Sequence, residues 1–440
     1  MTSAPQPIQR TGVSRAARER PANARARAIA IVWIVLGAVL VAVPARAEDA
    51  ALEAFVSEVV RTNSGLRARV LEGESLRREA SAAGIWPDPE IALMFDNFPD
   101  RMGGEMPMVR YQVSQMLMWP GKLALMEASL TRRAESKAAM ARLRKLELVR
   151  EAKRAYLMLA LNAGLRRINH SSRELLTTVV NAALARYGAG TGGHHEVVRA
   201  EVERNALEVE AFNLEGERVS TLAMMNALRN ARTDVTFPDP PEPPAEASPV
   251  GALAELVRLA EGRRPELESM QAMQREEVAM ATLARRERMP DLMTSVWYNQ
   301  MLGAPDSMGI MLGARLPLFN LTRQTRRAEA ADLRAESSRH DFEAMRAMIR
   351  FEIADALRRV ETAARSLDLV VTVAIPAAQQ SFASSLAGFS TGSLDVVGVL
   401  EAWRALQSVE RARLDASIAG SMAFADLERA AGGPLPRTNP

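Results

Sequence analysis

The chain contains no cysteine among its 440 residues. This absence excludes disulfide bonds, thiolate metal sites and catalysis by a thiol. Aromatic residues are also scarce, at 5% of the chain, whereas apolar residues as a whole reach 48%. Few aromatics together with abundant alanine and arginine favour long helices that pack closely through small side chains over a thick globular core.

An excess of charge of one sign is also missing, because 56 Lys and Arg residues face 53 Asp and Glu residues. Part of the small positive excess lies in the first 27 residues, so the rest of the chain gives no basis for nucleic-acid binding. The sequence contains no P-loop, no H-E-x-x-H and no G-x-S-x-G motif. We therefore expect no enzyme, no cofactor and no nucleic-acid partner.

The N-terminus has the pattern of a secretory signal peptide. Arginines from Arg10 to Arg27 precede an uninterrupted apolar run, Ala28–Val43, and Ala45–Ala47 (ARA) supplies a cleavage motif. We predict that residues 1–47 are a signal peptide cleaved after Ala47. An uncleaved anchor helix is the alternative, but the run is shorter than the roughly 20 residues that a membrane span needs.

The remaining chain repeats itself at an offset of about 199 to 203 residues. The matching pairs are Leu52 with Leu253, Leu66 with Leu267, Pro87 with Pro290, Tyr187 with Phe389, and Gly190 with Gly392. We predict two repeats, 48–235 and 251–431, followed by a tail, 432–440. A proline-rich linker, 236–250, joins the repeats because it can form neither a helix nor a central strand.

Each repeat is predicted to run helix, strand, strand, long helix, turn, helix. In the first repeat we expect helices at 50–84, at about 122–187 and up to about Asn230, with strands at 90–97 and 109–117. The second repeat is expected to carry its strands within 291–317.

At 1.5 Å per residue the long helix spans about 100 Å and each flanking helix about 50 Å. The long helix can therefore run antiparallel beside two shorter helices stacked end to end. The predicted fold class is mainly α, with long antiparallel coiled-coil helices and four β-strands per chain. A generic helical bundle explains the helices but not the strands.

The predicted strands alternate apolar and polar residues. Ile91, Leu93 and Phe95 share one face of the first strand, and Val296 and Tyr298 share one face of the third. This alternation is typical of a strand between lipid and a lumen, and also of a soluble sheet with one solvated face. No other window reaches the length and hydrophobicity of a transmembrane helix, so a membrane span would need these strands. Four strands cannot close a barrel, since the smallest have about eight. Three chains would together contribute the strands of a twelve-stranded barrel.

With this order of elements, the sequence resembles the TolC-like outer-membrane efflux family over residues 48–431. The motif that carries the resemblance is an aromatic residue, a glycine three positions later and an acidic residue six positions after the glycine. It stands as Tyr187, Gly190 and Glu196, and again as Phe389 and Gly392 with Gly398 in the acidic position. The resemblance implies a homotrimer with a 12-stranded membrane β-barrel and a helical periplasmic tunnel. Its expected partners are a periplasmic adaptor, an inner-membrane pump of the RND type and outer-membrane lipid.

The resemblance also assigns the turn after each long helix to a periplasmic tip that meets the adaptor. The candidate docking residues are Tyr187, Gly190, His194, His195, Glu196, Phe389, Gly392 and Gly398. Glycine suits the tight reversal of a helical hairpin, although a glycine that only ends a helix would look the same. Glu401 is the candidate periplasmic gate, because a ring of three carboxylates would favour cations. The alternative is that Glu401 lies on a solvated helix face.

Two features suggest a metal. His194 and His195 are adjacent in the first tip, and methionines such as Met102, Met106 and Met308 gather in the strand regions. Methionine thioethers suit Cu(I), yet no carboxylate or thiolate cluster completes a site, and methionine commonly fills apolar surfaces. We therefore expect no resident metal. Export of metal cations stays open, since the sequence looks closer to the heavy-metal-resistance branch of the family.

The alternative function is that of a periplasmic coiled-coil adaptor without a barrel. Such adaptors carry a lipoyl-like β-domain between their coiled-coil arms. The sequence offers no stretch of short strands long enough for that domain.

Overall fold

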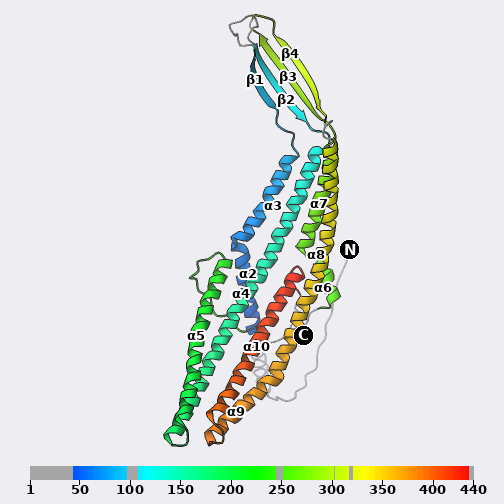
Figure 1. Cartoon of the computed structure of the whole chain (residues 1–440). Coiled ribbons are helices and arrows are strands. Elements are labelled where there is room, and N and C mark those ends of the chain that lie inside the picture. The colour runs from blue at the N-terminus through cyan, green and yellow to red at the C-terminus, as the bar shows by residue number, and fades with distance from the viewer. Residues whose placement is uncertain (1–42, 97–107, 244–250, 302, 317–320, 436–440) are drawn as a thin grey trace, which may run out of the picture. The chain divides into compact units, whose positions relative to one another are not determined.

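The computed structural model describes residues 43–96, 108–243, 251–301, 303–316 and 321–435 (Figure 1). Leu52–Pro440 form one structural unit, separate from Met1–Ala51. Most of the predicted signal peptide lies outside the described residues, as do Met102 and Met106. The predicted cleavage site at Ala47 falls within the first described helix, α2 (Val43–Thr62).

The first repeat contains the helices α2, α3 (Ser64–Ala83), α4 (Lys122–Gly188) and α5 (His194–Leu228). The single helix predicted over 50–84 is therefore wrong, because the chain breaks at Asn63. The Asn63 side chain caps α3 by accepting a 2.9 Å hydrogen bond from the Leu66 amide. Its Nδ2 donates to the carbonyl of Leu228, also at 2.9 Å, which ties the break to the end of α5.

The second repeat contains α6 (Leu253–Arg263), α7 (Pro265–Arg286), α8 (Leu321–Leu369), α9 (Ile375–Thr391) and α10 (Val396–Ala430). Arg264 stands at the break between α6 and α7, as Asn63 does between α2 and α3. Its Nη1 donates to the carbonyl of Ala430 at 3.0 Å. Leu228 and Ala430 occupy equivalent positions in the two repeats. Asn63 and Arg264 therefore donate hydrogen bonds to equivalent backbone carbonyls, although their side chains differ.

The long helix of the second repeat is interrupted by a π-helical segment, η2 (Val370–Ala374). Pro376 follows in the first turn of α9, where its missing N–H is tolerated. The helical run Thr322–Thr391 around this segment is long and apolar enough to cross a membrane by length and composition alone. We expected no segment besides the N-terminal apolar run to be long and hydrophobic enough for a transmembrane helix. That expectation is wrong, because Leu369 to Ala378 carry no charge.

Four antiparallel strands form one sheet in the order β1-β2-β3-β4, shown at one end of the Leu52–Pro440 unit in Figure 1. They are β1 (Glu90–Asp96), β2 (Met108–Leu117), β3 (Asp291–Met301) and β4 (Ser307–Arg315). The central pair, β2 with β3, joins the two repeats and places Tyr111 opposite Tyr298. In this four-stranded sheet β1 and β4 are the outer strands.

The helices pack as the lengths predict. The long helix α4 contacts α3 and α5 of its own repeat, and α7 and α10 of the other. Gly164 marks a close crossing of α4 and α10: a Cβ built there would lie 2.6 Å from Leu414 Cδ2. The predicted fold class, long antiparallel helices with four strands, is confirmed.

Candidate functional site: the helical turns and the two-faced sheet

Both predicted turns are present at the far end of the helices from the sheet (Figure 1). Gly190 lies between α4 and α5 with φ +72°, and Gly392 lies between α9 and α10 with φ +78°. This left-handed conformation is strained for residues with a Cβ, which explains glycine at the two equivalent positions.

Arg186, in the last turn of α4, connects the two turns. Its guanidinium carbon lies 4.6 Å from the ring centroid of Phe389. Its Nη1 donates hydrogen bonds to the carbonyls of Phe389 at 3.1 Å and Leu394 at 3.2 Å. Our sequence reasoning missed Arg186, because nothing near it in the chain reveals partners more than 200 residues away.

The two aromatic residues of the motif have different surroundings. Phe389 is fully buried in an apolar cluster that includes Val180, Leu400 and Trp403. Tyr187 is half exposed and stacks on His194, with 5.4 Å between ring centroids. The second turn is therefore fixed by core packing, whereas the first presents an aromatic side chain to its surroundings.

The acidic position of the motif also differs. Glu196 is buried in the first turn of α5, and its Oε2 has no hydrogen-bond partner in the part of the chain that the structure describes. In the second copy, Asp395 caps α10 by accepting a 3.0 Å hydrogen bond from the Gly398 amide. A Cβ at Gly398 would lie 2.9 Å from the Leu394 side chain. Glycine at this position therefore makes room for Leu394.

The candidate gate residue Glu401 is exposed on α10. One turn further along the same helix, Arg404 forms an ion pair with Glu203 of α5, and Arg411 repeats this with Glu210 seven residues later. Both pairs link the two repeats, and the first lies one turn from Glu401. His194 and His195 are both exposed. Among the described residues, no group of three or more His, Asp or Glu side chains could hold a metal ion.

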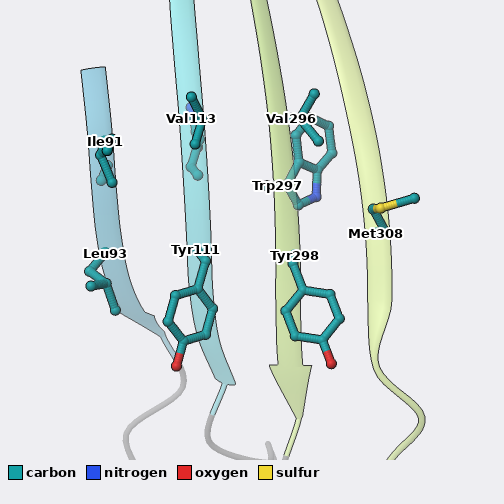
Figure 2. Close-up of a pocket in the computed structure, with 10 residues that line it drawn as sticks. Ile91, Leu93, Tyr111, Val113, Val296, Trp297, Tyr298 and Met308 are labelled. Carbon is teal, nitrogen blue, oxygen red and sulfur yellow. The ribbon is translucent and has the colours of Figure 1, made fainter. Parts of the chain in front are cut away.

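One face of the sheet is apolar and exposed, and Figure 2 shows part of it. The strand register places the predicted apolar positions side by side, with Ile91 opposite Val113, and Val113 opposite Val296. Tyr111 and Tyr298 lie beside each other with ring centroids 6.3 Å apart. The exposed apolar residues of this face include Ile91, Leu93, Phe95, Tyr111, Val113, Val296, Tyr298, Met308, Ile310 and Leu312.

The opposite face is more polar. Arg110 Nε donates to Asn299 Oδ1 at 2.9 Å, and Asn299 Nδ2 donates to Ser307 Oγ at 3.0 Å. Trp297 covers Gly309, since a Cβ at Gly309 would lie 2.3 Å from the indole ring. The sheet thus separates a broad apolar surface from a hydrogen-bonded one.

The helix α5 carries an exposed apolar stripe at coiled-coil spacing. Successive members are separated by four, seven, three and seven residues, as a and d positions of a heptad repeat are. They are between 45% and 76% exposed: Val198, Val202, Val209, Phe212 and Val219. A seam of this kind that is exposed among the described residues is typical of a surface that another helix covers.

Comparison with known proteins agrees with this geometry. Residues 256–433 match the family described as outer membrane efflux protein. The outer-membrane channel OprN has a similar fold (TM-score 0.75, 19% identity, covering 87% of this chain and 90% of that one). So do a membrane protein from Pseudomonas aeruginosa (TM-score 0.77, 18% identity, 87% and 90% covered) and VceC from Vibrio cholerae (TM-score 0.74, 16% identity, 87% and 96% covered). No curated protein matches the chain in sequence.

Residues 256–433 thus match the outer membrane efflux proteins, and the chain shares the fold of the solved outer-membrane channels. The predicted resemblance to the TolC-like outer-membrane efflux family is therefore confirmed, and so is the prediction of a protein that is not an enzyme. At these identities the solved structures establish the fold.

Proposed function

We propose that this protein is the outer-membrane channel of a tripartite efflux system and carries solutes from a periplasmic adaptor and an inner-membrane pump to the exterior. The observation that carries the proposal is the two-faced sheet. An exposed apolar face suits lipid, and a polar opposite face suits an aqueous lumen.

The sheet cannot serve this function as a single copy. Its outer strands β1 and β4 would leave backbone groups without hydrogen bonds in lipid, which the bilayer does not tolerate. Three copies that pair β4 of one chain with β1 of the next would contribute twelve strands. The stripe on α5 supplies a helical surface for the same neighbour. Both features support a homotrimer.

The two turns are the proposed docking surface for the adaptor. Tyr187, His194 and His195 are exposed there and can contact a partner directly. Gly190, Gly392 and Gly398 shape the turns, and Phe389 anchors the second turn in the core. A pump of the RND type remains the proposed inner-membrane partner. Glu401 remains the proposed gate, since it is exposed beside the ion pairs that join α10 to α5.

The test is fractionation of the expressed chain followed by size analysis in mild detergent. We expect a species cleaved after Ala47, in the outer-membrane fraction, at about three times the mature mass. A soluble monomer would instead support the periplasmic adaptor.

A matched pair of variants makes the test specific to the sheet. Leu93→Asp places a charge on the apolar face and is expected to abolish outer-membrane assembly, because a charge at mid-membrane costs about 2–4 kcal/mol. Gln112→Asp places the same charge on the polar face and should assemble as the wild type does. Equal assembly of both variants would overturn the lipid-facing assignment.

A further inference from the structure

The methionines of the sheet are confined almost entirely to one face. Six of them share the face of Arg110 and Asn299, because their positions alternate with those of the apolar residues in the strand register. They are Met94, Met108, Met116, Met293, Met301 and Met311. Met308 alone among the described strand methionines lies on the apolar face.

This distribution is the reverse of what apolar filling would give. Apart from Met308, the exposed apolar residues of the lipid-suited face are Ile, Leu, Val, Phe and Tyr, which have no soft donor atom. Methionine is the apolar side chain whose thioether can also bind a metal. Its placement on the polar face therefore calls for a reason other than hydrophobic bulk.

Three of these methionines lie together near the helical end of the sheet. Met116 of β2 is directly opposite Met293 of β3, and side chains in such pairs have Cβ atoms about 4.5–5.5 Å apart. Met293 is opposite Gly313 of β4, which puts Met311 diagonally next to it. Diagonal neighbours are about 7–8 Å apart and within reach of long side chains. Gly313 places no side chain between the thioethers.

A second observation comes from Ser295, the neighbour of Met293 on the same face. Ser295 is 2% exposed and lies between Ser114 and Met311 in the register. Its Oγ has no hydrogen-bond partner within the described residues. A buried hydroxyl without a partner costs free energy, and a bound cation or its water would satisfy the oxygen.

We propose that Met116, Met293 and Met311 form a thioether site for a soft monovalent cation, Cu(I) or Ag(I), on the polar face of the sheet. The proposal rests on the proposed function, in which this face lines the lumen, and it names the class of cargo. Pairing of Met108 with Met301 at the other end of the strands provides a second thioether pair along the same path.

The three thioether ligands suit a cation that passes through the channel better than one that stays bound. Neutral thioethers favour soft ions over Mg²⁺ and similar hard ions. The nearest carboxylate on this end of β3, Asp291, is already paired with Lys122 at 2.8 Å. Glu90 of β1 lies on the same face, diagonal to Met116, but the proposed ligands themselves are neutral. Neutral ligands release the ion readily, as conduction requires.

The test measures Ag⁺ binding to the detergent-purified protein by equilibrium dialysis in chloride-free buffer. We expect saturable binding that excess Mg²⁺ does not displace. The variant with Met116→Leu, Met293→Leu and Met311→Leu should bind at least about tenfold more weakly, since leucine keeps the volume and removes the sulfur. Met308→Leu on the opposite face is the matched control and should bind as the wild type does.

The outcomes separate this inference from the proposed function. An outer-membrane trimer that binds no Ag⁺ saturably, or whose triple variant binds equally well, overturns the thioether site and leaves the channel intact. Loss of binding in Met308→Leu equal to that in the triple variant also overturns it. A soluble monomer overturns the proposed function, and with it the cation path, whatever its affinity for Ag⁺.

Discussion

Arg186 and Phe389, 203 residues apart, form the contact that holds the two helical turns together. The guanidinium stacks at 4.6 Å from the ring centroid while it donates to the Phe389 carbonyl. One side chain at the end of α4 thereby adds a direct contact to the core packing that positions the turn between α9 and α10.

We predict that Arg186→Ala loosens the second turn without unfolding the protein. Loss of a cation–π contact and of charged hydrogen bonds should reduce local stability by about 1–3 kcal/mol. Hydrogen exchange of the amides from Gly388 to Leu394 should accelerate accordingly. Arg199→Ala, at an exposed position on α5, is the control and should leave this exchange unchanged. Unchanged exchange in Arg186→Ala would show that Phe389 packing alone holds the turn.

Two helical glycines should respond in opposite directions to alanine. Gly164→Ala pushes a Cβ to 2.6 Å from the buried Leu414 side chain and should destabilise the protein by about 1–3 kcal/mol. Gly216 in α5 has no neighbour within 4 Å of the same atom, so Gly216→Ala should stabilise by about 0.5–1 kcal/mol. Denaturant midpoints of the two variants check the prediction, and a shift in the same direction would contradict it.

The ion pair of Arg264 with Glu266 is predicted to be essential for folding. Arg264 is 1% exposed, and its guanidinium also bonds Glu352. Removal of the cation in Arg264→Ala leaves the buried Glu266 with Arg429, at 3.2 Å, as its remaining cation, and should cost up to about 3–5 kcal/mol. Thermal unfolding measures the loss.

The chain offers a control with the same spacing. Arg232 pairs with Asp234 two residues later, but both are exposed. Arg232→Ala should therefore cost no more than about 1 kcal/mol. A cost as large as that of Arg264→Ala would mean that burial does not set the difference.

Glu261 makes part of the stability dependent on pH. Hydrogen bonds from Arg346, and then from Arg350, lower the pKa of Glu261 from 4.5 to about 2 against the opposing effect of burial. A lowered folded-state pKa gives stability that is present above about pH 4.5 and is lost as the pH falls through about 2. Glu261→Gln should be less stable than the wild type at pH 7, and the difference should shrink towards pH 2. A difference that is constant with pH would contradict the ion-pair origin.

The proposed gate is tested in planar bilayers. Glu401→Gln removes the carboxylate and should reduce the preference of the channel for cations. Glu217→Gln, at an exposed position on α5, is the control. Unchanged selectivity in Glu401→Gln would remove this residue as a gate.

The strands and long helices could be predicted from the sequence, because they depend on the pattern of neighbouring residues. The alternation around Ile91 and Leu93 places both side chains on one face, and the observed register aligns that face with Val113 and Tyr111. The four-strand, long-helix architecture follows from such patterns, because periodicity and helix length are properties of neighbouring residues.

The features that escaped prediction depend on partners far away in the chain. The break at Asn63 is stabilised by the carbonyl of Leu228, and Arg186 acts on Phe389. The π segment at Val370–Ala374 is an exception, because Pro376 lies two residues after it and lacks the N–H of a regular helical ladder. The environments of the docking residues differ between copies for the same reason: Leu394 fills the space above Gly398, and its carbonyl accepts a hydrogen bond from the distant Arg186.

The pairing of β2 with β3 joins the two repeats directly, in addition to the linker that connects them in the chain. Ten consecutive residue pairs, from Met108 with Met301 to Leu117 with Leu292, bind one half to the other at the centre of the sheet. The interface between the two repeats thus lies inside the sheet. A single repeat would have to pair with a second repeat before its strands could enter lipid.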